Sequence, residues 1–287
     1  MKKLSIIFLL TVVSLVSVFP GGTKEQKASG GSQSVAAVQS SAPAPYTVTV
    51  AGSTSVSPLM ELLTADYAKV RSNVKFNISA TGSGDGIKAV PAETAEIGMS
   101  SRELSPAEIG TGIDEHLIAI DGIAVIVNAN NPVSGLSIEQ IRDIYTGALT
   151  DWSQAGGRSG KIAVVSREPG SGTRGAFEEI VKFQDKLVMG AIEFDGTGAV
   201  KAEISRNADA IGYISLGSVD NSVKPLSVGG VTATTANVVN GSYKIARPFL
   251  LLTKKGKTLN SETKAFLDWI LTEPGQAIVK TSWISVK

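Results

Sequence analysis

Three short turns rich in glycine and hydroxyl side chains constrain this chain most, because each follows a run of residues with strand character. In the clearest case, residues 161–165 have the apolar pattern of a buried strand and residues 173–183 have the spacing of an amphipathic helix. Strand and helix patterns also alternate along the rest of the chain from Tyr46 onward. Strands separated by helices indicate an α/β fold with largely parallel sheets.

The same patterns predict the individual elements. Strand patterns cover residues 46–50, 74–80, 211–214 and 249–252, and helical patterns cover residues 58–70 and about 261–271. Capping boxes at Ser105 and Ser137 predict two further helix starts. A C-terminal segment is expected from Pro274 onward.

The three turns contain the groups that bind oxyanions. Their sequences are Gly52-Ser53-Thr54-Ser55, Gly82-Ser83-Gly84-Asp85-Gly86 and Gly170-Ser171-Gly172-Thr173-Arg174. Backbone N–H groups at a helix start favour an anion, because the positive end of the helix dipole lies behind them. Arg167, four positions before Ser171, adds a full positive charge. Together the turns predict one oxyanion held from several sides.

Other interpretations of each turn remain open. Hydroxyls of the first turn can cap the following helix, and at least one of them is expected to do so. The second turn fits an ordinary tight turn, for which Asp and Gly are standard residues. The third turn, with Glu193 about 20 residues later, matches the G-x-G-x-x-G string of dinucleotide folds. The nearby Arg167 and an export signal favour a small oxyanion over a nucleotide.

Charge and composition restrict the function classes. The chain is 43% hydrophobic, which is enough for a large core, and its formal net charge is +1. The first 45 residues hold four lysines and one glutamate, so the remainder has a formal charge of −2. This balance argues against nucleic acid as a partner. Affinity for an anion must therefore be local.

The N-terminal region is typical of an export signal. Lys2 and Lys3 precede an apolar run over residues 4–18, which predicts a signal peptide over residues 1–20. The alternative is an anchoring helix, although the run is short for a membrane span. Residues 21–45 are rich in small and polar residues and predict a disordered linker. Because the chain has no cysteine, we expect neither disulfides nor a lipid anchor, and a protein that is free in the periplasm.

Catalytic and metal-binding patterns are scarce. His116 is the only histidine, and the chain has no G-x-S-x-G motif to accompany it. It is expected at an exposed position before a strand. One histidine without cysteines does not build a metal site. The segment Gly156-Gly157-Arg158-Ser159-Gly160-Lys161 lacks the glycine spacing and the final hydroxyl of a P-loop. We therefore expect no enzyme activity, no cofactor and no metal.

Taken in order, several segments resemble the phosphate-binding protein (the substrate-binding component) of the high-affinity phosphate ABC transporter. The resemblance spans nearly the whole chain after the linker. It is carried by Ala51-Gly52-Ser53-Thr54-Ser55, Thr81-Gly82-Ser83-Gly84, Ile97-Gly98-Met99-Ser100-Ser101-Arg102, residues 136–147 with Asp151-Trp152, residues 167–173, Ile211-Gly212-Tyr213 and Arg247-Pro248.

The resemblance implies a two-lobed periplasmic-binding-protein fold of type II, α/β with mixed sheets and a ligand cleft between lobes that close by hinge motion. Lobe I would comprise residues 46–123 plus 249–287, and lobe II residues 124–248. The implied ligand contacts are Thr54, Ser55, Ser83, Ser101, Arg167, Ser171, Gly172 and Thr173. Physically, Arg167 can bind two oxygens of phosphate at once, and the hydroxyls can donate to the others.

One position departs from the family pattern. Many members have an aspartate that accepts the proton of hydrogen phosphate, and this chain has Ser101 there. A hydroxyl can accept that hydrogen bond but lacks the charge that rejects sulfate. Asp85 and Glu168 are the other candidate acceptors. Sulfate, molybdate or arsenate are therefore alternatives to phosphate.

The expected function is capture of inorganic phosphate and its delivery to an inner-membrane ABC permease, by a protein that the resemblance implies to be a monomer. Two alternatives use other chemistry. One is a hydrolase acting through an exposed serine, which lacks a partner histidine or a metal set. The other is a sensory or adhesive module that binds phosphate but reports to a receptor or a surface.

Overall fold

The computed structural model describes residues 44–287. The expected signal peptide and almost all of the expected linker lie outside these residues. The first strand, β1, begins at Tyr46, where the folded part was expected to start. Among the described residues, no helix is both long enough and apolar enough to span a bilayer.

Helices and strands alternate along the chain. The helices are α1 (Ser57–Val70), α2 (Ser83–Ala89), α3 (Ile138–Thr146), α4 (Gly172–Val181), α5 (Thr197–Arg206), α6 (Thr235–Val239), α7 (Ser261–Ile270) and α8 (Glu273–Val279), with short 3₁₀ helices η1 (Trp152–Ala155) and η2 (Leu216–Ser218). The strands are β1 (Tyr46–Gly52), β2 (Val74–Ala80), β3 (Ile97–Ser100), β4 (Ile113–Asn128), β5 (Gly135–Leu136), β6 (Ala163–Arg167), β7 (Ile192–Phe194), β8 (Ala210–Ser215), β9 (Val223–Pro225), β10 (Ser227–Val228) and β11 (Ala246–Lys254).

Parallel and antiparallel pairs are combined in one continuous series of strands. Its order is β2-β1-β3-β11-β4-β8-β6-β7, and β9 pairs with β4. The pairs β1–β2, β1–β3, β6–β7 and β6–β8 are parallel. Strand β11 runs antiparallel to β3 and β4, and β4 runs antiparallel to β8. The sheets are thus mixed, as the resemblance implied, because β4 and β11 link two parallel α/β units.

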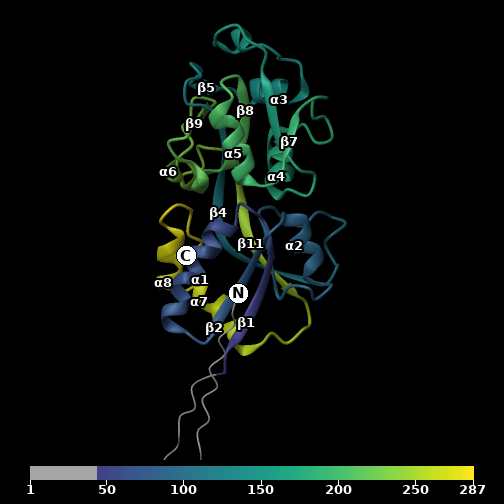
Figure 1. The fold of residues 1–287 in the computed structure, drawn as a ribbon, viewed down its shortest axis with the longest axis vertical. Coiled ribbons are helices and arrows are strands. Elements are labelled where there is room, and N and C mark those ends of the chain that lie inside the picture. Colours follow the sequence, from purple (N-terminus) through teal and green to yellow (C-terminus); the bar gives the residue numbers. More distant parts are fainter. Residues whose placement is uncertain (1–43) are drawn as a thin grey trace, which may run out of the picture. The chain divides into compact units, whose positions relative to one another are not determined.

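Two large hydrophobic clusters, with a third of only five buried residues, fill the described part of the molecule. The first contains buried residues from 48–119 and 249–283, and the second contains buried residues from 123–245. We call the part around the first cluster lobe I and the part around the second lobe II. Strand β4 contributes to both, and Figure 1 shows β4 and β11 running between the two groups of helices. Strand β4 passes from one cluster to the other without a break, so no loop separates the lobes there. The lobe boundaries given above therefore stay a prediction.

Local sequence explains the best-defined helix. Ser137 caps α3: its Oγ accepts from the backbone N–H of Gln140, and the Gln140 side chain accepts from the backbone N–H of Ser137. Gly147 ends the helix in a left-handed conformation with φ of 83°. The predicted helix start at Ser137 is therefore confirmed.

Two local predictions were wrong. The capping box at Ser105 opens only a turn, because Glu108 accepts from the Ser105 N–H but forms a salt bridge with Arg102 and no helix follows. His116 lies inside β4, half-buried, and its Nε2 is 2.8 Å from the Thr253 hydroxyl. The C-terminal segment expected from Pro274 onward contains α8, which begins at Glu273 with Pro at its first turn.

Candidate oxyanion site

The predicted site residues come together where lobe I and lobe II are in contact. Of the eight implied ligand contacts, six are polar residues that are nearly inaccessible to solvent. Their exposed fractions are 0% for Ser55, Ser83 and Ser101, 1% for Arg167 and Thr173, and 2% for Ser171. Gly172 is also buried, and Thr54 is partly buried. A buried cluster of hydroxyls around an arginine is unusual for a protein interior, where polar groups need partners.

Hydroxyl groups of the first turn reach across to lobe II. Ser55 Oγ is 2.8 Å from Thr173 Oγ1 and 3.1 Å from Thr197 Oγ1. Thr54 Oγ1 is 3.3 Å from Thr197 Oγ1 and accepts from the Thr197 backbone N–H. Ser53 faces the other way: its Oγ accepts from the backbone N–H groups of Ser55 and Val56. Ser53 thus closes the turn before α1, but the helix has no side-chain cap, so the expected capping role was wrong.

The second turn and Ser101 form a neighbouring part of the same cluster. The Ser101 backbone N–H donates to Ser83 Oγ at 3.1 Å, and the two hydroxyl oxygens are 3.3 Å apart. Ser83 is the first residue of α2, so the glycine-rich turn is a helix start rather than a tight turn. A Cβ atom at Gly172 would be 2.8 Å from Ser101 Oγ and closer still to Ser83 Oγ. Only a glycine permits this approach of lobe II to lobe I.

Arg167 lies at the end of β6 and contacts both lobes. Its Nε and Nη2 each donate to one oxygen of Glu168, both at 2.7 Å, in a two-pronged ion pair. Nη2 also donates to Thr54 Oγ1 at 3.0 Å, and Nη1 donates to Thr197 Oγ1 at 3.4 Å. The guanidinium therefore directs its donors toward the hydroxyl cluster.

The backbone of Arg167 is held rigidly by its neighbours. The Tyr213 hydroxyl accepts from the Arg167 N–H and is 2.8 Å from Ser166 Oγ. Arg174 Nη1 donates to the Arg167 carbonyl at 2.8 Å. Burial raises the pKa of Tyr213, whose ring stacks on Phe177 at 4.1 Å, so the phenol stays protonated. These contacts fix the arginine before any ligand arrives.

Thr197, at the start of α5, is a site residue that the sequence did not reveal. Its hydroxyl is 5% exposed and lies near Thr54, Ser55 and Arg167. The signal was present, because Asp195-Gly196-Thr197-Gly198 is another glycine and hydroxyl turn after a strand. That strand, β7, has only three residues and gives no recognisable pattern.

The two candidate acceptors beside Ser101 differ in position. Asp85 is exposed and outside the cluster. Glu168 is partly buried, accepts from the Gly196 N–H as well as from Arg167, and has no direct contact with the clustered hydroxyls. Ser171 Oγ accepts from the Arg174 N–H as the cap of α4. The Ser171 hydroxyl proton is not used in this bond and can be donated to another acceptor.

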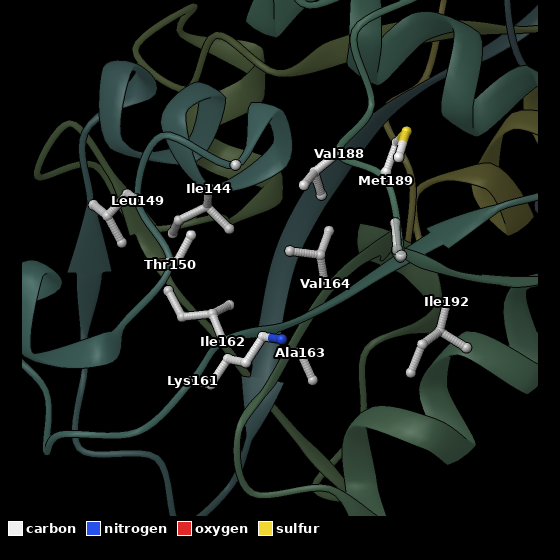
Figure 2. Close-up of a pocket in the computed structure, with 13 residues that line it drawn as sticks. Ile144, Leu149, Thr150, Lys161, Ile162, Ala163, Val164, Val188, Met189 and Ile192 are labelled. Carbon is white, nitrogen blue, oxygen red and sulfur yellow. The ribbon is translucent and has the colours of Figure 1, made fainter.

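Other polar and hollow regions lie away from this cluster. Within residues 44–287, no group of three or more His, Cys, Asp or Glu side chains could hold a metal ion. A cavity of about 350 Å³ in lobe II is lined mainly by aliphatic side chains, with Lys161 and Thr150 among them. Figure 2 shows Ile144, Val164 and Ile192 around it. It contains none of the predicted site residues and is chemically unsuited to a small oxyanion.

Two α/β lobes joined by paired strands, with a buried polar site between them, define a two-lobed substrate-binding protein. The model of the PBP superfamily domain matches residues 37–274. A crystal structure of a putative phosphate ABC transporter substrate-binding protein with bound phosphate, from Clostridium perfringens, is 46% identical, with a TM-score of 0.83 over 84% of this chain and 100% of that one. An ABC-type phosphate transport receptor from Vibrio cholerae is 33% identical, with a TM-score of 0.69 over 83% and 99% of the two chains.

A curated relative agrees over the full length. The phosphate-binding protein PstS of Bacillus subtilis is 28% identical over 286 residues, which cover 98% of this chain and 92% of the relative. The chain therefore belongs to the PBP superfamily, and within it to the phosphate ABC transporter substrate-binding proteins. The expected family and the type II fold are confirmed.

Proposed function

We propose that this protein captures inorganic phosphate between its lobes outside the cytoplasm and delivers it to an ABC permease. The observation that carries the proposal is the convergence of Arg167 with the starts of three helices of ten or more residues, α1, α4 and α5. Each of those starts contributes a buried or partly buried hydroxyl, and helix starts favour anions. The relatives that contain or are named for phosphate support this choice of anion.

The clustered hydroxyls would bind the anion by exchanging partners. The Ser55 hydroxyl now hydrogen-bonds to those of Thr173 and Thr197, and each of the three can redirect its proton to a phosphate oxygen. Arg167 would donate to the anion through the Nη1 and Nη2 protons that now contact Thr197 and Thr54. Charge-assisted hydrogen bonds of this kind contribute about 1.5–3 kcal/mol each.

Binding requires the lobes to move apart and close again. The Ser55 and Thr173 oxygens are 2.8 Å apart, which is one hydrogen bond and leaves no room for a tetrahedral anion between them. The Gly84 N–H also donates directly to the Gly170 carbonyl across the lobes, at 3.0 Å. We propose hinge motion about β4 and β11, which are the strands that connect the lobes.

The choice among tetrahedral anions depends on the acceptor for the phosphate proton. Ser101 Oγ is buried beside Ser83 and can accept from a protonated phosphate oxygen. Sulfate has no such proton at neutral pH, but the same hydroxyl can turn and donate to a sulfate oxygen, so Ser101 should reject sulfate less strongly than a carboxylate would. The selectivity of the site therefore depends on a neutral hydroxyl instead of a carboxylate.

Calorimetric titration of the purified, ligand-stripped protein with phosphate, sulfate and molybdate tests the proposal. Tight binding of phosphate with weak binding of the other two is the expected result. Preference for sulfate or molybdate would transfer the function to that anion, and failure of all three would refute the site. Hydrolysis of a chromogenic phosphate ester would instead favour the hydrolase interpretation. Phosphate-dependent stimulation of the permease ATPase would distinguish transport from sensing, and light scattering would test the monomer.

A further inference from the structure

A second buried guanidinium, that of Arg247 on β11, lies where the two lobes join. Its Nε and Nη2 donate to the same carboxylate oxygen of Asp121 on β4, at 3.2 and 3.0 Å. The two residues face each other in the antiparallel β4–β11 pairing, and β4 pairs with β8 from Ile123 onward. The ion pair therefore marks the point where both connecting strands pass from one lobe to the other.

The carboxylate of Asp121 is used entirely within this junction. Its second oxygen accepts from Ser215 Oγ at 2.8 Å, at the end of β8. Both side chains of the ion pair are 1% exposed. Burial raises the pKa of Asp121, and the charge of Arg247 opposes that change. Asp121 thus holds strand ends together and makes no contact with the hydroxyl cluster.

Arg247, in contrast, also reaches the candidate site. Its remaining amino group, Nη1, donates to the Ser101 carbonyl at 3.3 Å. On its other side, Ser101 donates its backbone N–H to Ser83 Oγ. The position of Ser101 is therefore fixed by Arg247 at its carbonyl and by Ser83 at its amide.

The charge of Arg247 also affects the site. Burial lowers the pKa of Arg247, and repulsion from the positive charge of Arg167 lowers it further. Because Arg247 donates to the Ser101 carbonyl, its charge lies behind the wall of the site that Ser101 forms and attracts an anion that binds there. Arg247 can therefore favour an anion without donating to it.

We propose that Arg247 is a positioning residue for anion binding, which holds Ser101 in the wall of the site and adds a second positive charge behind it. The proposal rests on the proposed function, because it requires an oxyanion in the hydroxyl cluster. Asp121 is its internal control: it belongs to the same ion pair but serves only the junction. Loss of either charge should destabilise the fold, whereas only loss of Arg247 should weaken binding.

Four variants separate the two roles. Arg247→Gln removes the charge and is too short to reach Ser101, while Arg247→Lys keeps the charge. Asp121→Asn keeps one acceptor oxygen for Arg247, and the Ser215 hydroxyl can turn to accept from the new amide group. The double variant Asp121→Asn/Arg247→Gln leaves no unpaired buried charge, so it should fold even if the single variants do not. Each is titrated calorimetrically with inorganic phosphate and unfolded with urea.

The expected result is a loss of phosphate affinity of at least tenfold in Arg247→Gln, partial recovery in Arg247→Lys, and a change of less than threefold in Asp121→Asn. The double variant should regain stability against urea but not affinity. Equal losses of affinity in Arg247→Gln and Asp121→Asn, or recovery of both properties in the double variant, would overturn the proposal. Absence of phosphate binding in the unmodified protein would instead refute the proposed function, and the series would then be titrated with the anion that binds.

Discussion

The two lobes contribute different chemistry to the candidate site. Lobe I presents only neutral hydroxyl and backbone groups, from Thr54, Ser55, Ser83 and Ser101. Lobe II presents the charged pair Arg167 and Glu168 together with the hydroxyls of Thr173 and Thr197. Attraction for an anion therefore comes mainly from lobe II, and lobe I completes its hydrogen bonds.

The two lobes also differ in how firmly these groups are held. Arg167 is fixed through Tyr213 and Arg174 before any ligand is present. The hydroxyls of Thr54 and Ser55 on lobe I, in contrast, have their closest partners on the opposite lobe. The charged groups of lobe II are thus in place before the neutral groups of lobe I cover them, which implies an order of binding steps. The anion should bind lobe II first, and closure of lobe I should follow.

Loss of the charge on lobe II should have the largest effect. Arg167→Gln removes at least two charge-assisted hydrogen bonds to the anion, each of about 1.5–3 kcal/mol, so the affinity for phosphate should fall by about 100-fold or more. Ser55→Ala, on lobe I, removes one hydrogen bond from an uncharged donor to the anion, worth about 1.5 kcal/mol, and should cost about tenfold. Calorimetry compares the two directly.

A control is needed because Arg167→Gln leaves Glu168 without its partner. The double variant Arg167→Gln/Glu168→Gln restores charge balance and should bind as poorly as the single variant. Equal losses of phosphate affinity in Ser55→Ala and Arg167→Gln would contradict the conclusion that lobe II supplies most of the attraction for the anion.

A methyl group at the surface where the lobes meet should have the next largest effect. In Gly172→Ala, the new Cβ would be 2.8 Å from Ser101 Oγ and closer to Ser83 Oγ, which prevents full closure. Phosphate affinity should fall by roughly tenfold, and small-angle scattering should show a larger radius of gyration with phosphate than in the unmodified protein.

Gly198, inside α5, provides the matched control. A Cβ there meets no atom within 4 Å, and alanine favours the helix. Gly198→Ala should keep the affinity and the compact phosphate-bound state. If Gly172→Ala also closed normally, the two lobes would have to meet in a different way when phosphate is bound.

Removal of the Thr197 hydroxyl should have a smaller effect. Thr197→Val keeps the shape of the side chain but loses one hydrogen bond, worth about 1 kcal/mol, so affinity should fall by about fivefold. Ser205→Ala, at the exposed far end of α5, removes a hydroxyl that donates only to the Ala202 carbonyl and should leave affinity unchanged. Unchanged binding by Thr197→Val would remove this residue from the site.

The smallest effect concerns the segment of lobe I that follows Ser101. Hydrogen bonds from Arg102 lower the pKa of Glu108 to about 2, below its ordinary 4.5. The resulting stabilisation is complete above pH 4.5 and is lost as the pH falls toward 2. For this partly exposed pair we expect about 1 kcal/mol or less.

Urea unfolding of Glu108→Gln tests this expectation. The variant should be less stable than the unmodified protein at pH 6, and the difference should shrink at pH 3. A difference that stayed constant between these pH values would show that the ion pair with Arg102 does not stabilise the fold. Phosphate binding should be nearly unchanged.

Local sequence patterns predicted much of the site, because turns after strands carry recognisable residues. Ser55, Ser83 and Thr173 were placed in such turns and Arg167 just before one, and all four are buried where the lobes meet. Thr197 was missed because the three-residue strand before it is too short to show alternation.

Contacts between distant segments could not be predicted from the sequence. The pairing of Asp121 with Arg247 depends on the register between β4 and β11, which lie more than 100 residues apart and which no local pattern encodes. The capping box at Ser105 failed for a related reason, because the Arg102 side chain engages Glu108. In both cases a tertiary contact decided the outcome.

Strand β4 also has a consequence for how the protein unfolds. It supplies buried residues to both hydrophobic clusters, with Ile118 and Ala119 in the first and residues 123–127 in the second. Melting of either lobe would expose part of the core of the other, so we expect a single cooperative transition instead of two. The central amides of this strand should be among the slowest in the molecule to exchange with deuterium.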